Sequence, residues 1–195
     1  WIQPDFKLKI RTDFPRKDLP GMKEIFMLRQ RMFSLGDPPD IRAILHLEEI
    51  VDEGSPPEMI ADLAVGMLVV SQFLEGKEQK SLLKKTELFL RKAILKNKKS
   101  ARLYSLLAEN YYLSGNYVSW VEKTAEDAIR IDPQNELGFI LKVIVNDSDD
   151  ETRKKDVEQI KQLNPWLFSK AVNGGNLFQK GILKNELSRM EIPLK

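Results

Sequence analysis

Few side chains in this sequence are arranged for catalysis. His46 is the single histidine, and it stands close to Glu48 and Glu49, next to which it could act as a general base. No second histidine, HExxH pattern or serine elbow accompanies it, and cysteine is absent. Glycine-rich phosphate-binding motifs are also missing, because Gly174-Gly175 stands alone. We therefore interpret His46 as an ordinary helix residue, and we expect neither an enzyme nor a cofactor.

An acidic segment at residues 147–158 has the ligand spacing of a calcium-binding loop. Acidic residues take its first, third and fifth places and a glutamate takes the twelfth, as in an EF-hand. Thr152 occupies the sixth place, where the sharp turn needs glycine, and basic residues follow it. The alternative is a capping box, in which Ser148 and Glu151 open a helix. We favour the capping box and expect no metal site.

Charge is segregated along the chain, although the formal net charge is only +2. Residues 77–100 carry nine Lys or Arg against two Glu, whereas residues 40–62 carry one Arg against seven acidic residues. A basic amphipathic helix of this kind can lie on an anionic membrane or contact phosphates. The small net charge does not indicate a nucleic-acid-binding protein, and none is expected. We interpret the basic segment as a solvated helix face, with a contact to the acidic segment 40–53 as a further structural use.

Composition predicts a helical protein with a core of its own. The 195 residues are 42% hydrophobic, which is enough for a sizeable core without metal or disulfides. The charged fraction of 31% accompanies long segments rich in Leu, Lys and Glu, which favour helices. No apolar run approaches the roughly 20 residues that span a bilayer, so we expect a soluble chain without a transmembrane segment. The chain begins at Trp1, so it stays open whether a signal or an anchor has been removed. For the same reason the location stays open, either cytoplasmic or periplasmic and anchored.

The elements are predicted from apolar periodicity and from proline and glycine. Residues 1–20 hold three prolines and alternate apolar with charged residues, which predicts an extended arm laid over helices. Residues 21–54 predict two N-terminal helices, the second from about Asp40 to about Asp52. Residues 57–74 are apolar on most faces, which indicates a buried central helix, and residues 81–96 are amphipathic.

Residues 100–135 contain the best-formed pattern, two amphipathic helices joined by a turn at Ser114-Gly115-Asn116. Small residues dominate the apolar stripe of the second helix, so the two backbones can pack closely. Pro133 cannot continue a helix, which predicts an end near Ile131. The inward-facing residues are Tyr104, Leu107, Ala108 and Tyr111 in the first helix and Val121, Ala125 and Ala128 in the second.

This segment resembles a tetratricopeptide repeat (TPR). The match covers Tyr104-x2-Leu107-Ala108-x2-Tyr111, Gly115-x-Tyr117 and Ala128-Ile129-x-Ile131-Asp132-Pro133, with Ala108 in place of the usual glycine and one extra residue before Val121. The resemblance implies an all-α fold, a right-handed superhelix of αα-hairpins with helical N- and C-terminal additions. On this interpretation the chain is one domain, with a degenerate repeat at residues 57–99, a full repeat at 100–135, a truncated repeat at 136–165 and a C-terminal cap at 166–195.

The resemblance also implies a function, because first helices of successive TPR repeats line a concave groove that receives a peptide or a partner helix. We therefore expect a non-catalytic scaffold or adaptor for protein–protein interaction. The alternative is a TPR-like solute-binding or transporter-accessory protein with a small-ligand pocket. It stays open whether residues 1–20 or the tail after Pro165 fill the groove. It also stays open whether the chain is a homo-oligomer. The residues of the first helix predicted to contact the partner are Arg102, Ser105, Glu109, Tyr112 and Leu113.

Overall fold

The described part of the chain is entirely helical. The computed structural model describes residues 41–52, 55–145 and 150–164, which form seven α-helices and no strand. For these residues the predicted all-α class is confirmed. The arm expected at residues 1–20, the first of the two helices expected within residues 21–54 and the cap expected at 166–195 lie outside them. The helices are α2 (Ile41–Ile50), α3 (Pro57–Ser71), α4 (Gly76–Lys96), α5 (Ala101–Leu113), α6 (Val118–Ile131), α7 (Glu136–Val145) and α8 (Asp150–Leu163).

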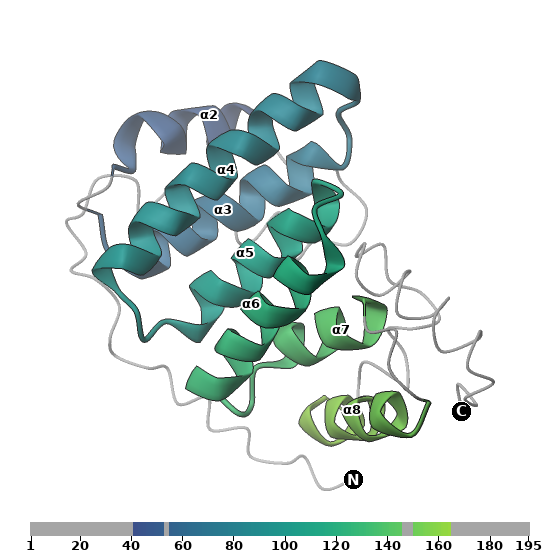
Figure 1. Ribbon diagram of the computed structural model, residues 1–195. Helices are drawn as coiled ribbons and strands as arrows, with labels where there is room; N and C mark the ends of the chain where they lie inside the picture. The colour runs from purple at the N-terminus through teal and green to yellow at the C-terminus, as the bar shows by residue number, and fades with distance from the viewer. Residues whose placement is uncertain (1–40, 53–54, 146–149, 165–195) are drawn as a thin grey trace, which may run out of the picture.

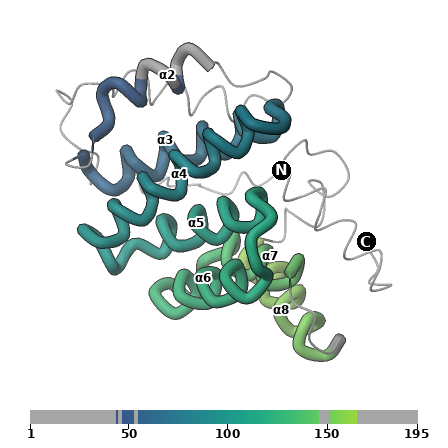
Figure 2. The backbone as a smooth tube through the Cα atoms, turned by 45° about the horizontal axis from the view of Figure 1, so that its top comes forward, coloured from purple at the N-terminus to yellow at the C-terminus, as the bar shows by residue number. Residues whose placement is uncertain are grey.

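Consecutive helices pack against each other and form a stack. Figure 1 shows α3 and α4 near the top of the view, α5 and α6 in the middle, and α7 and α8 below. Helix α5 also packs directly on α3 and on α7, and α2 packs on α3. In the second view, α5 lies between the α3–α4 pair and the α6–α7 pair (Figure 2). Helix α5 therefore lies in the middle of the stack, where α3, α4, α6 and α7 all pack against it.

Helix α3 is buried among several helices, as its apolar sequence predicted. It begins at Pro57, where the missing N–H of proline costs no helical hydrogen bond. Helices α2, α4 and α5 all pack against it, so side chains around most of its circumference, such as Leu63, Met67 and Leu68, are buried. Each fully buried Leu or Met contributes about 1.5–3 kcal/mol to the burial term of folding. This helix therefore anchors the amino-terminal half of the described core.

The turn after α5 has a backbone geometry that depends on glycine. Gly115 has a φ of 66°, a left-handed conformation that residues with a Cβ rarely adopt. The N–H of Asn116 donates to the carbonyl oxygen of Tyr111 over 3.0 Å, and the N–H of Gly115 donates to that of Tyr112 over 3.1 Å. This pair of bonds is the Schellman motif, which satisfies carbonyl groups at a helix end. The turn predicted at this place is present.

Small residues let α6 pack closely on both of its neighbours. Val121, Ala125 and Ala128 are buried, as the alanine-rich stripe of the sequence predicted. On the side of α7, a Cβ added to Gly138 would lie 2.9 Å from Cγ1 of Ile129 and 3.2 Å from the backbone oxygen of Ala125. Real Cβ atoms do not approach other atoms so closely, so Gly138 sets the distance between α6 and α7.

Several helix ends agree with those predicted from local sequence, but α3 ends at Ser71, before the predicted end at Leu74, and the start of α4 also differs. Helix α6 ends at Ile131, as predicted from Pro133, and α8 ends at Leu163, two residues before Pro165. Helix α4 begins at Gly76, earlier than the predicted start at Ser81. Gly76 makes the turn itself, with a φ of 60°, and the residues after it contain no helix breaker.

Polar contacts as well as apolar ones join α7 to α8. The side-chain amide of Asn164, just after α8, donates to both carboxylate oxygens of Glu136 at the start of α7, each over 3.0 Å. Nζ of Lys142 lies 3.3 Å from Oδ2 of Asp156, with both side chains largely buried. Ile160 of α8 is fully buried. The carboxyl-terminal pair is thus joined by two polar contacts at different places along its interface.

Candidate functional site

The five residues predicted to contact a partner lie on α5 and differ in accessibility. Arg102 keeps 40% of its side chain exposed, whereas Ser105 and Glu109 are buried. Tyr112 and Leu113 are partly buried and pack against the hydrophobic core. The sequence placed all five on an accessible face, but four helices pack against α5 and leave little of its surface uncovered. That these five residues bind a partner stays a prediction.

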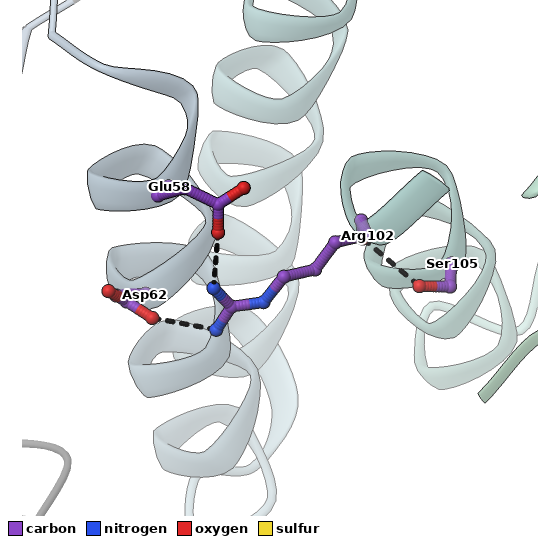
Figure 3. A network of polar contacts seen from close by, with 4 residues as sticks. All are labelled: Glu58, Asp62, Arg102 and Ser105. Atoms are coloured by element: carbon purple, nitrogen blue, oxygen red, sulfur yellow. Dashed lines mark hydrogen bonds and ion pairs between the residues drawn. The ribbon is translucent and has the colours of Figure 1, made fainter. Parts of the chain in front are cut away.

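Arg102 is the centre of a polar cluster that joins α5 to α3. Its Nη1 donates to Oε2 of Glu58 over 2.8 Å, and its Nη2 donates to Oδ1 of Asp62 over 2.6 Å. Figure 3 shows the guanidinium group reaching from α5 to both carboxylates. Glu58 and Asp62 are four residues apart, so successive turns of α3 present them on one face. The fork of the guanidinium fits this arrangement, because its donors diverge in one plane.

The two carboxylates have different environments. Asp62 is 4% exposed, whereas 57% of the Glu58 side chain is exposed. Burial lowers the pKa of Arg102, but the charges and hydrogen bonds of Asp62 and Glu58 outweigh it, so the pKa lies above its ordinary value. Arg102 is therefore a permanent cation that compensates the buried charge of Asp62. Its contact with Glu58 is an exposed ion pair, which contributes little to stability.

The Ser105 hydroxyl group bonds within its own helix. Its Oγ donates to the carbonyl oxygen of Arg102 over 3.0 Å (Figure 3). A buried hydroxyl group needs such a partner, because leaving it unsatisfied costs about 1–3 kcal/mol. Ser105 thus places a small, satisfied side chain one turn after Arg102.

Glu109 is the most strongly perturbed acidic group of the described chain. It is buried, and burial raises its pKa from the ordinary 4.5 to about 8. A neutral carboxyl group can donate a hydrogen bond as well as accept one, whereas an ionised one only accepts. Near neutral pH, Glu109 is therefore largely protonated in the folded protein. It is one turn beyond Ser105, on the same side of the helix as Arg102.

Two residues of this cluster, Glu58 and Asp62, were not predicted as site residues, and neither was Asn110, which lies outside the cluster. Asp62 and Glu58 were noted only as part of an acidic segment, although their spacing of four residues is a local signal for a shared helix face. Nothing local indicated that Arg102, some 40 residues later, would meet them. Asn110 is buried, and its side-chain amide donates to the carbonyl oxygen of Leu83 in α4 over 3.0 Å. No local pattern distinguishes this asparagine from an exposed one.

The predicted contact between the basic and acidic segments is present. Nζ of Lys85 in α4 lies 2.5 Å from Oε2 of Glu48 in α2. His46 lies in the same acidic helix, and its side chain is outside the described set. The interpretation of His46 as an ordinary helix residue stays a prediction.

Within residues 41–52, 55–145 and 150–164, no group of three or more His, Cys, Asp or Glu side chains is placed to hold a metal ion. The calcium-like segment is only partly described, because residues 146–149 lie outside that set. None of the seven described helices is both long enough and apolar enough to cross a membrane.

Comparisons with known proteins do not assign a family. No protein-family model, curated protein or solved structure matches the chain.

Proposed function

We propose that this chain is a TPR-like helical adaptor that binds an extended peptide or a partner helix beside the exposed ion pair of α3 and α5. The packing of the described helices supports this proposal. The first helix of each pair contacts the first helix of the next, since α5 packs on both α3 and α7. In a repeat protein this contact forms the layer from which partner-binding side chains project.

The observation that carries the proposal is the asymmetric contact of Arg102 with two carboxylates. Asp62 is buried and holds the guanidinium in place, while Glu58 is exposed and contributes a weak pair. A guanidinium group has five N–H donors. A partner carboxylate or backbone carbonyl can therefore bind Arg102 by replacing Glu58 at small cost. Because Asp62 already orients the guanidinium, little conformational freedom is lost on binding.

Apolar contacts for the same partner come from the end of α5. Tyr112 and Leu113 are partly buried, so each retains accessible surface beside the core. Aromatic residues and arginine are enriched among the residues that dominate binding energy at protein interfaces. The expected ligand is a segment with an acidic group or a carboxyl terminus for Arg102, followed by an apolar side chain.

Selection from a library of random displayed peptides tests this proposal. Peptides chosen by the intact chain are synthesised, and their affinities are measured by fluorescence anisotropy. Arg102→Lys keeps the charge but loses the planar fork, so affinity is expected to fall about tenfold. Arg130→Lys is the matched control, because Arg130 pairs with Asp127 on the exposed side of α6.

Glu58→Ala separates binding from stability in the same assay. It removes the exposed competitor for Arg102, so the affinity for an acidic peptide is expected to rise a few-fold while the far-UV circular dichroism stays unchanged. If both the Arg102 and Glu58 variants bind selected peptides as the intact chain does, this cluster is not the binding site and the proposal fails.

A further inference from the structure

A second surface, separate from the Arg102 cluster, lies on the outer side of α4. Residues spaced three or four apart in a helix follow one line along its surface. One such line of α4 combines basic residues with two leucines that face solvent, and Leu95 is 72% exposed. We call this line the basic face; it consists of Lys77, Lys80, Lys84, Leu88, Arg91 and Leu95, all of them exposed.

The structure brings aromatic side chains to this basic face. The guanidinium carbon of Arg91 lies 5.7 Å from the ring centroid of Tyr111. The Tyr111 ring meets Trp120 edge-on with centroids 5.7 Å apart, and Trp120 meets Tyr117 in the same way at 5.9 Å. Trp120 and Tyr117 are exposed, Tyr117 to 75%, and so is Val118 between them. Charged, aliphatic and aromatic groups are thus linked from α4 to the start of α6.

We propose that the basic face, together with Tyr117, Val118 and Trp120, docks on the surface of a membrane that contains anionic phospholipids. Lysines near such a surface are attracted by its negative potential. Exposed leucines in the middle of a basic helix face enter the boundary between headgroups and acyl chains. Tryptophan and tyrosine favour the same depth, since their rings are apolar and their polar tips stay hydrated.

The composition of this surface favours lipid over nucleic acid. Phosphates of a nucleic acid are bound best by the planar fork of arginine, but this face has three lysines and one arginine. The exposed leucines also add nothing to a contact with phosphates. Leucines among lysines do match a membrane surface, where charged headgroups lie above apolar acyl chains. The chain would lie on such a membrane, in keeping with the absence of a spanning helix among those described.

Co-sedimentation with vesicles tests this inference on the full chain. Vesicles of phosphatidylcholine alone are compared with vesicles that also contain about one third phosphatidylserine, at low and at high salt. Binding is expected only with phosphatidylserine and is expected to weaken with salt. Each lysine contributes about a fivefold factor, so replacing Lys77, Lys80 and Lys84 by Gln is expected to weaken binding on the order of 100-fold.

The control variant removes the same charge elsewhere. Lys154→Gln, Lys155→Gln and Lys161→Gln together change three lysines of α8, a helix that contributes nothing to the proposed surface. If this variant loses as much binding as the first, only the net charge matters and the proposal is overturned. Leu88→Ser with Leu95→Ser leaves the charge intact and replaces two exposed side chains. It is expected to weaken vesicle binding at least tenfold, and unchanged binding overturns the proposal.

The emission of Trp120 reports insertion directly. In a chain with Trp1→Phe and Trp166→Phe, Trp120 is the remaining tryptophan, and its emission is expected to shift to shorter wavelength with phosphatidylserine vesicles. Polyglutamate and oligo-dT serve as probes for an acidic protein and for nucleic acid. Binding to either that exceeds vesicle binding and persists in the Leu88→Ser, Leu95→Ser variant would assign the surface to that class of partner instead.

Discussion

Nη2 of Arg102 lies 2.6 Å from Oδ1 of Asp62, and through this contact a half-exposed cation of α5 compensates a buried anion of α3. The same guanidinium group binds Glu58, whose carboxylate remains in water. One arginine thus has a structural partner and an exchangeable partner. The two carboxylates should therefore contribute differently to the free energy of unfolding, and this difference can be measured.

Arg102→Ala is expected to lower the free energy of unfolding by about 2 kcal/mol, because it removes a hydrogen-bonded countercharge from buried Asp62. Glu58→Ala is expected to cost less than about 0.5 kcal/mol, since its ion pair is exposed. Urea unfolding followed by circular dichroism measures both. Adding Asp62→Asn to the Arg102→Ala variant is expected to recover part of the loss. Equal costs for the two single variants would contradict the assignment of roles.

Glu109 makes stability depend on pH. Its pKa in the folded protein is about 8, above the ordinary 4.5, because burial disfavours the charged form. At a pH below 4.5 the carboxyl group is protonated in both states, and its contribution to stability is fully present. As pH rises towards 8, the unfolded chain releases the proton and the folded chain retains it, so that contribution is progressively lost.

Glu109→Gln removes this dependence. The variant is expected to gain stability relative to the intact chain as pH rises from about 4.5 to about 8, by an amount on the order of a few kcal/mol. Unfolding midpoints across this pH range measure the difference. Glu126→Gln changes an exposed glutamate of α6 and is the matched control. Parallel pH profiles for Glu109→Gln and the intact chain would refute the prediction.

Gly138→Ala is expected to destabilise the protein although alanine favours helices. The new methyl group would lie 2.9 Å from Ile129 and 3.2 Å from the backbone of α6, which forces the two helices apart. Overpacking of this kind costs about 1–3 kcal/mol, and the gain in helix propensity offsets about 1 kcal/mol of it. Ile129→Ala in the same chain removes Cγ1, the atom of the closest contact, so the two substitutions together are expected to cost less than the sum of their separate losses, which thermal unfolding measures.

Gly115→Ala is expected to cost about 1 kcal/mol for a different reason. No atom lies within 4 Å of a Cβ built there, so the cost comes from the left-handed backbone alone. Gly115→Asn is expected to cost less, because asparagine tolerates that conformation. Denaturant midpoints of the two variants give the comparison. A larger loss for asparagine than for alanine would show that space, not backbone angle, limits this position.

The helices and several of their ends could be predicted from the sequence because those features depend on neighbouring residues. The apolar periodicity, the turn at Gly115 and the end of α6 at Ile131 follow from side-chain spacing and from backbone angles of glycine and proline. The candidate site was predicted less completely. Arg102 was singled out, but its two partners were not.

What the tertiary structure decided is which helix faces meet. A helix's own pattern shows which face is apolar, but not which neighbours cover the rest. Ser105 and Glu109 look like surface residues in sequence and are buried because four helices pack around α5. Likewise, Arg91 of α4 and Trp120 of α6 both meet the Tyr111 ring of α5 only through the packing of these three helices. The sequence by itself determined the helices, and their packing determined the partners of Arg102, the raised pKa of Glu109 and the aromatic edge of the basic face.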